Sequence, residues 1–151
     1  VALTPPPDLV VTSIVSPEVA AEGSAIDVSW TVLNQGLGDA RGTWTDAVFL
    51  RRAGDTGNGT QIGSYTFEGP LVAGQSYTRR EQVTVPIHTS DRYEILVRTD
   101  SGGVVYEHTR ENNNTSTDDT QLSVTVLPRP DLQVSDIVGP DVVDAGGTAS
   151  I

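Results

Sequence analysis

The feature that most limits what this chain can fold into is an internal repeat. The segment PDLVVTSIVSP at Pro7–Pro17 returns as PDLQVSDIVGP at Pro130–Pro140, an offset of 123 residues. The same offset carries Gly23 onto Gly146, and each copy follows a proline-rich lead-in. A period of about 120 residues is too long for a solenoid unit and has the usual size of an autonomous domain. The sequence therefore predicts tandem domains rather than one continuous fold.

The repeat also predicts the domain boundaries. Residues 1–6 form a proline-rich linker, and residues 7–126 contain one complete unit. Residues 127–130 repeat the linker, and residues 131–151 begin a second copy that is incomplete in this sequence. Proline-rich linkers are extended and semi-rigid, which favours domains held apart at a set spacing.

Within the unit, apolar residues alternate with polar ones, which indicates strands rather than helices. The clearest case places Ile26, Val28, Trp30 and Val32 on one face of a single strand. Short strands separated by turn residues are typical of a β-sandwich. We expect an all-β, antiparallel sandwich of seven to eight strands, with strands near residues 8–16, 25–32, 44–52, 61–67, 76–85, 92–99 and 120–126.

Composition excludes several classes of partner. The chain has 20 acidic and 9 basic residues, a formal net charge of −11. That charge argues against binding to nucleic acid, whose phosphates need a basic surface, and against anionic membranes. No apolar run approaches the roughly 20 residues that a membrane-spanning helix needs. The sequence predicts neither a nucleic-acid partner nor membrane insertion.

An ordered series of short motifs runs through the whole unit and resembles the CARDB family, the cell-adhesion-related domain found in bacteria. The resemblance implies an immunoglobulin-like β-sandwich that occurs in tandem in large secreted or surface-anchored prokaryotic proteins. It implies no common ligand and no catalytic residue. The motifs are Pro7-Asp8-Leu9, Trp30-Thr31-Val32-x-Asn34-x-Gly36, Trp44-x-Asp46-x-Val48-x-Leu50, Gly69-x-Leu71-x-x-Gly74-x-Ser76-Tyr77, Val97-x-Thr99-Asp100 and Val105-x-Glu107-x-x-x-Glu111-Asn112-Asn113.

We therefore predict a non-catalytic structural or adhesive module located outside the cell or on its surface, in a stalk, adhesin or filament. Its expected partners are neighbouring repeats of the same protein. One alternative is an accessory domain of a secreted enzyme that binds carbohydrate or protein. Another is a fibre subunit that donates a strand from residues 131–151 to its neighbour. The residues predicted for that strand are Asp131, Leu132, Val134, Ile137 and Val138.

An acidic segment after the sixth predicted strand is the best candidate for a metal site. Asp100, Glu107, Glu111 and Asn112 carry the carboxylate and amide oxygens that calcium prefers. Alternation places Asp46 on the inward face of its strand, from where it could complete the set. Two interpretations stay open: a calcium site, or a loop held by its own Asn side chains and solvated carboxylates. For Asp46 the second interpretation is a carboxylate at the rim that bonds loop amides or an Arg. No other cofactor is predicted.

Three asparagines fit the N-glycosylation pattern: Asn58, Asn113 and Asn114. The two histidines, His88 and His108, lack the close partners that zinc sites need. The chain has no Gly-x-Ser-x-Gly nucleophile elbow. We predict that this unit is not an enzyme.

Overall fold

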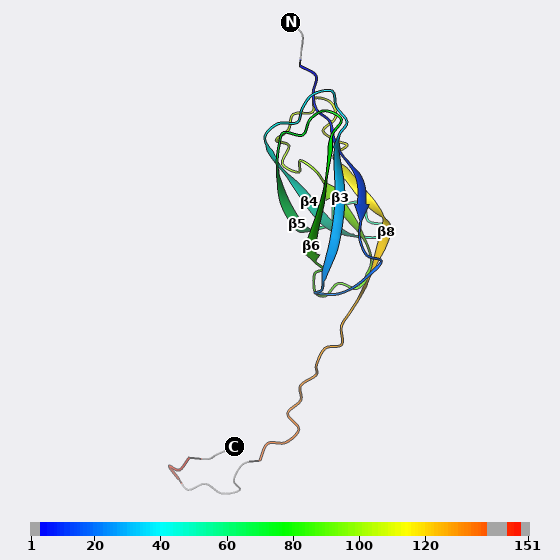
Figure 1. The fold of residues 1–151 in the computed structure, drawn as a ribbon. Coiled ribbons are helices and arrows are strands. Elements are labelled where there is room, and N and C mark those ends of the chain that lie inside the picture. The colour runs from blue at the N-terminus through cyan, green and yellow to red at the C-terminus, as the bar shows by residue number, and fades with distance from the viewer. Residues whose placement is uncertain (1–3, 139–144, 149–151) are drawn as a thin grey trace.

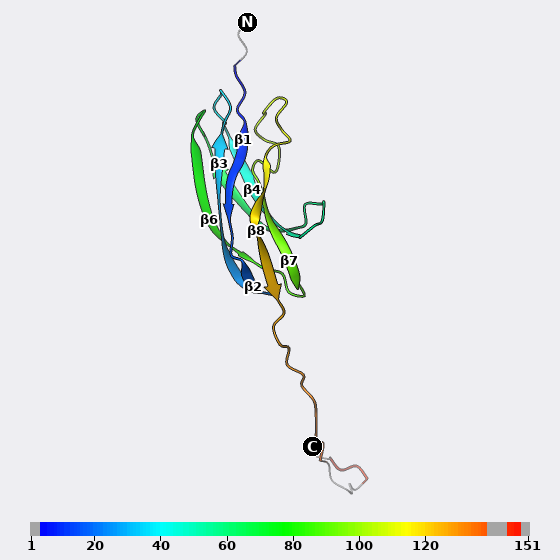
Figure 2. The ribbon, with the colours of Figure 1, turned by 90° about the vertical axis from the view of Figure 1, so that its right-hand side faces the viewer.

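The computed structural model describes residues 4–138 and 145–148, and it places two β-sheets face to face. A three-stranded sheet has the order β1-β3-β6, and a five-stranded sheet has the order β2-β8-β7-β4-β5 (Figures 1 and 2). The described residues contain no helix that could cross a membrane. The eight strands are β1 (Leu9–Val15), β2 (Val19–Ala21), β3 (Ala25–Asn34), β4 (Thr43–Arg52), β5 (Thr60–Glu68), β6 (Ser76–Thr84), β7 (Asp91–Arg98) and β8 (Thr115–Thr125).

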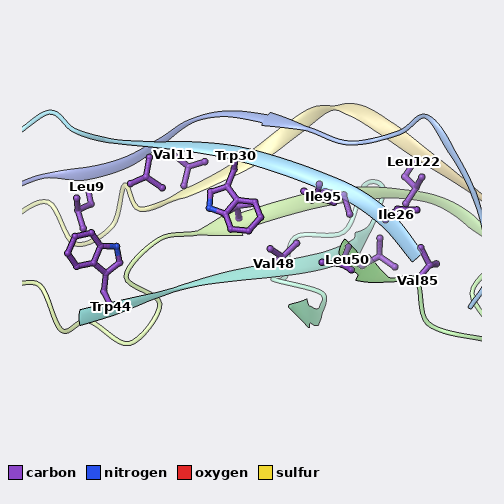
Figure 3. Packing of buried hydrophobic residues seen from close by; sticks show 14 of the residues in the cluster. Leu9, Val11, Ile26, Trp30, Trp44, Val48, Leu50, Val85, Ile95 and Leu122 are labelled. Carbon is purple, nitrogen blue, oxygen red and sulfur yellow. The ribbon is translucent and has the colours of Figure 1, made fainter. Parts of the chain in front are cut away.

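The core lies between the two sheets and is built by alternation along the strands. In β3, Ile26, Val28, Trp30 and Val32 are buried, as the sequence predicted. The side chains of one sheet pack against those of the other, as sandwiches require (Figure 3). The predicted all-β, immunoglobulin-like sandwich is confirmed.

The two ends of the unit lie at opposite poles of the sandwich (Figure 1). We call the end where residues 4–7 meet the strands the N-terminal pole; it also carries the β3–β4, β5–β6 and β7–β8 loops. The C-terminal pole is the end where β8 leaves the sandwich, and it carries the β2–β3 turn and the β6–β7 loop. A chain through the unit therefore enters at one pole and leaves at the other.

One strand pairing differs from the predicted antiparallel arrangement. After β1 the chain crosses to the other sheet, where the short strand β2 pairs with β8 in parallel: Val19 faces Ser123 and Ala21 faces Thr125. Both strands run toward the C-terminal pole, because the crossover from β1 does not reverse the chain. The remaining pairs of the described strands are antiparallel.

The sandwich also leaves strands at the edges of its sheets. β6 ends the three-stranded sheet and carries Arg79, Arg80 and Glu81 in succession. Arg80 forms an ion pair with Asp27 of the neighbouring strand β3, at 2.7 Å. The outer side of this sheet is therefore charged rather than apolar.

Candidate functional site

Asp46 is a fully buried carboxylate in the core between the sheets. It lies in β4 with no solvent exposure, as the alternation predicted. Its Oδ2 accepts hydrogen bonds from the indole N–H of Trp30, at 2.8 Å, and from the hydroxyl of Tyr77, at 2.8 Å. The Tyr77 hydroxyl in turn accepts from Trp44 Nε1, at 3.2 Å. Burial raises the pKa of Asp46, and these hydrogen bonds offset part of the rise.

These contacts correct both expectations for Asp46. It is not a rim residue that binds loop amides or an Arg, and it does not lie with the acidic segment after β7. It instead joins the two sheets, because Trp30 and Tyr77 belong to the three-stranded sheet and Asp46 to the five-stranded one. Because Trp30 and Tyr77 both donate to it from the opposite sheet, the carboxylate links the two sheets by hydrogen bonds inside the core, and we call this link the clamp.

Glu107, in the β7–β8 loop, is also fully buried and holds the beginning of the first strand. Its Oε1 accepts from the backbone N–H of Leu9, at 2.6 Å, and its Oε2 accepts from Asn114 Nδ2, at 2.8 Å. Burial raises the pKa of Glu107 to about 7, and the nearby carboxylates of Glu111 and Asp8 add to this rise. Glu111 folds back on the loop and accepts from the Glu107 amide, at 2.7 Å.

Asp8 directly precedes β1, and its side chain binds both the β3–β4 turn and the β7–β8 loop. Its carboxylate accepts hydrogen bonds from Asn113 Nδ2, at 2.8 Å, from Gln35 Nε2, at 3.0 Å, and from Arg110. Burial alone would raise the pKa of Asp8, but these donors outweigh it and lower the pKa below its usual value. The buried Asn34 adds a further link, because its Oδ1 accepts from the Asp8 amide, at 3.1 Å.

The proline-rich segment before β1, residues 4–7, is called the lead-in. It lies against the turn between β3 and β4. The Gly38 amide donates to the carbonyl of Pro6, at 3.1 Å, and a Cβ at Gly36 would come within 2.6 Å of the Asp8 nitrogen. A Cβ at Gly38 would collide with the carbonyl oxygen of Pro5. Glycine is needed at these two positions because the backbone of the lead-in approaches so closely.

At the C-terminal pole, Glu22 holds the segment that leaves the sandwich. This nearly buried carboxylate accepts from the backbone N–H groups of His88, at 2.5 Å, and Leu127, at 3.3 Å. It also pairs with Arg129, at 3.3 Å, whose guanidinium lies 2.9 Å from His88 Nδ1. Burial alone would raise the pKa of Glu22, but these donors outweigh it and lower the pKa. Glu22 therefore binds the outgoing linker at both residue 127 and residue 129.

The family model for CARDB matches residues 6–118 of the chain. The chain belongs to the CARDB family. A solved CARDB domain, that of the PF1109 protein from Pyrococcus furiosus in complex with di-metal ions, is 26% identical, with a TM-score of 0.58. The match covers 81% of this chain and 96% of that domain. A solution NMR structure of the same PF1109 domain is 24% identical, with a TM-score of 0.57 and coverage of 79% and 95%. No curated protein matches the chain.

CARDB domains are non-catalytic, immunoglobulin-like modules, and the predicted family and fold are confirmed. Most of the motifs that carried the resemblance now have a structural role in this CARDB domain. Asp8, Asn34, Gly36, Glu107 and Asn113 all serve to hold the incoming chain. The four polar side chains among them make these contacts through hydrogen bonds, and Gly36 through the close approach of its backbone.

The five predicted calcium ligands do not come together. Asp46 lies in the core, and both oxygens of Glu107 accept hydrogen bonds from the protein. Asp100, Glu111 and Asn112 do share one polar groove of about 350 Å³. Asp100 nevertheless accepts from the amides of Val104 and Val105. Across residues 4–138 and 145–148, no three Asp, Glu, His or Cys side chains are placed to hold a metal ion.

These contacts make the residues present a poor fit for a preformed metal cage, although the PF1109 relative binds metal ions. Asp100 and Glu111 already accept hydrogen bonds from the backbone amides of Val104, Val105 and Glu107, which hold these carboxylates against their own loop. We therefore expect the melting temperature of the full chain to be the same in millimolar calcium and in chelator, measured by circular dichroism. A ligand that binds the folded state must raise the melting temperature. A rise in calcium that Asp100→Asn abolishes would establish the groove as a calcium site.

The remaining predicted site residues lie on the surface or in the linker. The side chain of Asn58 is exposed and accepts from Arg98, whereas the Nδ2 atoms of Asn113 and Asn114 donate to Asp8 and Glu107. N-glycosylation modifies Nδ2, so that prediction now rests on Asn58. Residues 131–138 run away from the sandwich, exposed and without a strand, and residues 139–144 and 149–151 of the second copy lie outside the described part (Figure 1). Strand donation from Asp131, Leu132, Val134, Ile137 and Val138 stays a prediction.

Sequence reasoning missed the roles of Glu22 and Asn34. Glu22 follows the short strand β2, which has no alternation to reveal it. Asn34 precedes Gln35-Gly36, a pattern that indicates a turn but gives no sign of a bond to a segment 26 residues earlier. Both roles depend on contacts with segments distant in the sequence, which only the fold brings together.

Proposed function

We propose that this CARDB domain is an extracellular spacer in a tandem array, and that its function is to transmit tension between its neighbours. One observation carries the proposal: the incoming and outgoing segments lie at opposite poles, and β2, which follows the first strand, pairs in parallel with the last strand β8. The internal repeat and the family membership support a tandem context. The acidic exterior supports a location outside the cell or on its surface.

The pairing of β2 with β8 suits this function for a geometric reason. A pull toward the N-terminal pole reaches β2 through β1, while the opposite pull acts directly on β8. The two parallel strands then slide along each other, so their hydrogen bonds are stressed together rather than one by one. The bonds from the Ser123 amide to the Glu18 carbonyl, at 2.8 Å, and from the Glu22 amide to the Thr125 carbonyl, at 2.9 Å, lie at the two ends of this pair.

Polar anchors at both poles add to the resistance. The Leu9 amide is bound to the buried Glu107, so the first strand cannot be peeled from its upper end without breaking a buried hydrogen bond. A buried carboxylate left without its donor costs more than an ordinary hydrogen bond. At the other pole, Glu22 binds Leu127 and Arg129 just past β8.

Single-molecule force spectroscopy of the full chain, pulled by its two ends, tests the proposal. We expect Ala20→Pro in β2 to remove most of the unfolding force, because proline disrupts the parallel pair. The matched control is Ser64→Pro in the edge strand β5, which reduces thermal stability but lies off the path of the force. Equal unfolding forces for the native chain and Ala20→Pro would contradict the proposal.

The alternative of a carbohydrate- or protein-binding accessory domain remains a prediction from the sequence. A glycan array probed with the full chain addresses it, and specific binding would favour that alternative over a pure spacer.

A further inference from the structure

We propose that consecutive copies of this repeat dock directly, with the C-terminal pole of one copy seated on the N-terminal pole of the next. The inference rests on the tandem arrangement of the proposed function and adds a specific interface to it. A groove at the N-terminal pole, described below, would thus be occupied by the preceding copy of the same domain. Three features carry the argument: a short shared linker, two grips on that linker, and apolar surfaces at both poles.

The linker between copies is short. Under the 123-residue offset, Thr4-Pro5-Pro6-Pro7 corresponds to Leu127-Pro128-Arg129-Pro130. The last strand ends at Thr125, and the counterpart of Leu9 is Leu132, so six residues join the two sandwiches. Fully extended as polyproline, six residues span about 19 Å. Two poles joined by so short a tether lie within reach of side-chain contact.

The preceding and the following copy both bind this linker, each through different groups of it. The copy before it binds the amide of Leu127 and the side chain of Arg129 through Glu22. The copy after it approaches the linker through its β3–β4 turn, as Gly38 here donates to the carbonyl of Pro6. Pro6 corresponds to Arg129, so the residue at this position binds the preceding copy through its side chain and the following copy through its carbonyl. The two grips do not compete, and together they fix the direction of the linker.

The N-terminal pole presents a large groove beside the lead-in. It has a volume of about 860 Å³, and its lining includes Pro5, Pro6, Pro7, Tyr106, His108 and Arg41. Tyr106 is 73% exposed and meets His108 edge to face, with ring centroids 6.2 Å apart. Leu37, at the tip of the turn that holds the lead-in, is 84% exposed. Large apolar side chains gathered at one end of a domain indicate a contact surface.

The C-terminal pole offers apolar residues to meet this groove. Ile87 is 66% exposed in the β6–β7 loop, beside the turn at Gly23. Val126 and Leu127 are 48% and 53% exposed where the chain leaves β8. These three residues surround the point where the linker starts, so they face the next copy at the same junction. Each pole thus exposes apolar side chains, and the opposite pole of a second copy would cover them.

The test uses two complete units in one chain, residues 7–126 joined by residues 127–130 to a second unit that begins at Asp8 and ends at residue 126, which keeps the six-residue spacing of the repeat. Each unit contains the whole buried cluster, from Leu9 to Val124, and so retains its own core. The chain has no cysteine, so Thr66→Cys in both units places one spin label on each edge strand β5. Pulsed electron paramagnetic resonance then gives the distribution of distances between the two units. We expect a single narrow distribution.

Substitutions placed in one unit at a time supply an internal control. Tyr106→Ala in the second unit should broaden the distribution several-fold, whereas the same change in the first unit, whose groove has no copy before it, should leave it narrow. Ile87→Ser should show the reverse pattern. A broad distribution in the unsubstituted protein, or equal effects of Tyr106→Ala in both units, would overturn the inference. The pulling experiment on the single unit is unaffected by either outcome, so the failure of one proposal is separable from the failure of the other.

Discussion

Replacing Asp46 with alanine is expected to destabilise the domain by about 3 kcal/mol, because one buried and one part-buried donor would lose their common acceptor. The indole of Trp30 and the hydroxyl of Tyr77 both point at this carboxylate from the opposite sheet. Water cannot replace the acceptor easily, since Asp46 is fully buried. Urea denaturation followed by the fluorescence of Trp30 and Trp44 measures the loss.

Two further variants make the Asp46 result specific. Asp55→Ala removes an exposed carboxylate from the β4–β5 loop and should change stability by no more than about 0.5 kcal/mol. Asp46→Asn keeps one acceptor oxygen and should lie between the alanine variant and the native protein. If Asp46→Ala is as mild as Asp55→Ala, the clamp between the sheets does not stabilise the fold.

Raising the pH from about 4.5 to about 7 is expected to lower the stability of the domain through Glu107, because its carboxyl group must ionise where it is buried. Its pKa is about 7 in the folded protein, against an ordinary value of 4.5, so the folded state binds the proton more tightly than the unfolded state. For a carboxyl group with a raised pKa, its contribution to stability is complete below about pH 4.5 and is lost as the pH rises to about 7. Above that range the dependence should level off.

The variant Glu107→Gln isolates this effect from other carboxylates. Asp8 and Glu22 have lowered pKa values, and their contributions run in the opposite direction, falling as the medium becomes acidic. Both remain in the variant, so they cancel when the two proteins are compared by urea denaturation at each pH. The stability difference, native minus Glu107→Gln, should decline between pH 5 and pH 7. A constant difference would show that the raised pKa is absent in solution.

The sequence was most informative where alternation was strong. Strands such as β3 were predictable because Ile26, Val28 and Trp30 follow each other at a period of two. The strand β2 was missed, because three residues cannot display a period, and its parallel partner lies about 100 residues away. The last strand was predicted from residue 120, yet it begins at Thr115, in a polar run that resembles a loop.

The candidate site shows a different limit of sequence reasoning. Alternation correctly turned Asp46 inward, but its partners Trp30 and Tyr77 come from two other strands, and only the packing of the sheets brings them together. Glu107 and the asparagines after it carry oxygen atoms suited to calcium, so composition alone suggested a metal site. Glu107 instead accepts from the backbone of Leu9, 98 residues earlier, and Asn113 and Asn114 donate through their nitrogen atoms to Asp8 and Glu107. Residue chemistry was visible in the sequence, and the identity of the partner was not.

The charged run Arg79-Arg80-Glu81 on the edge strand β6 has a consequence for assembly. An unpaired strand edge can pair with another edge of the same kind, and the proposed tandem array would present identical edges at a high local concentration. Pairing two such edges in parallel and in register would place each of these three charges opposite its own copy. The charges therefore make side-to-side pairing of two β6 edges unfavourable, which is consistent with the end-to-end contact proposed above.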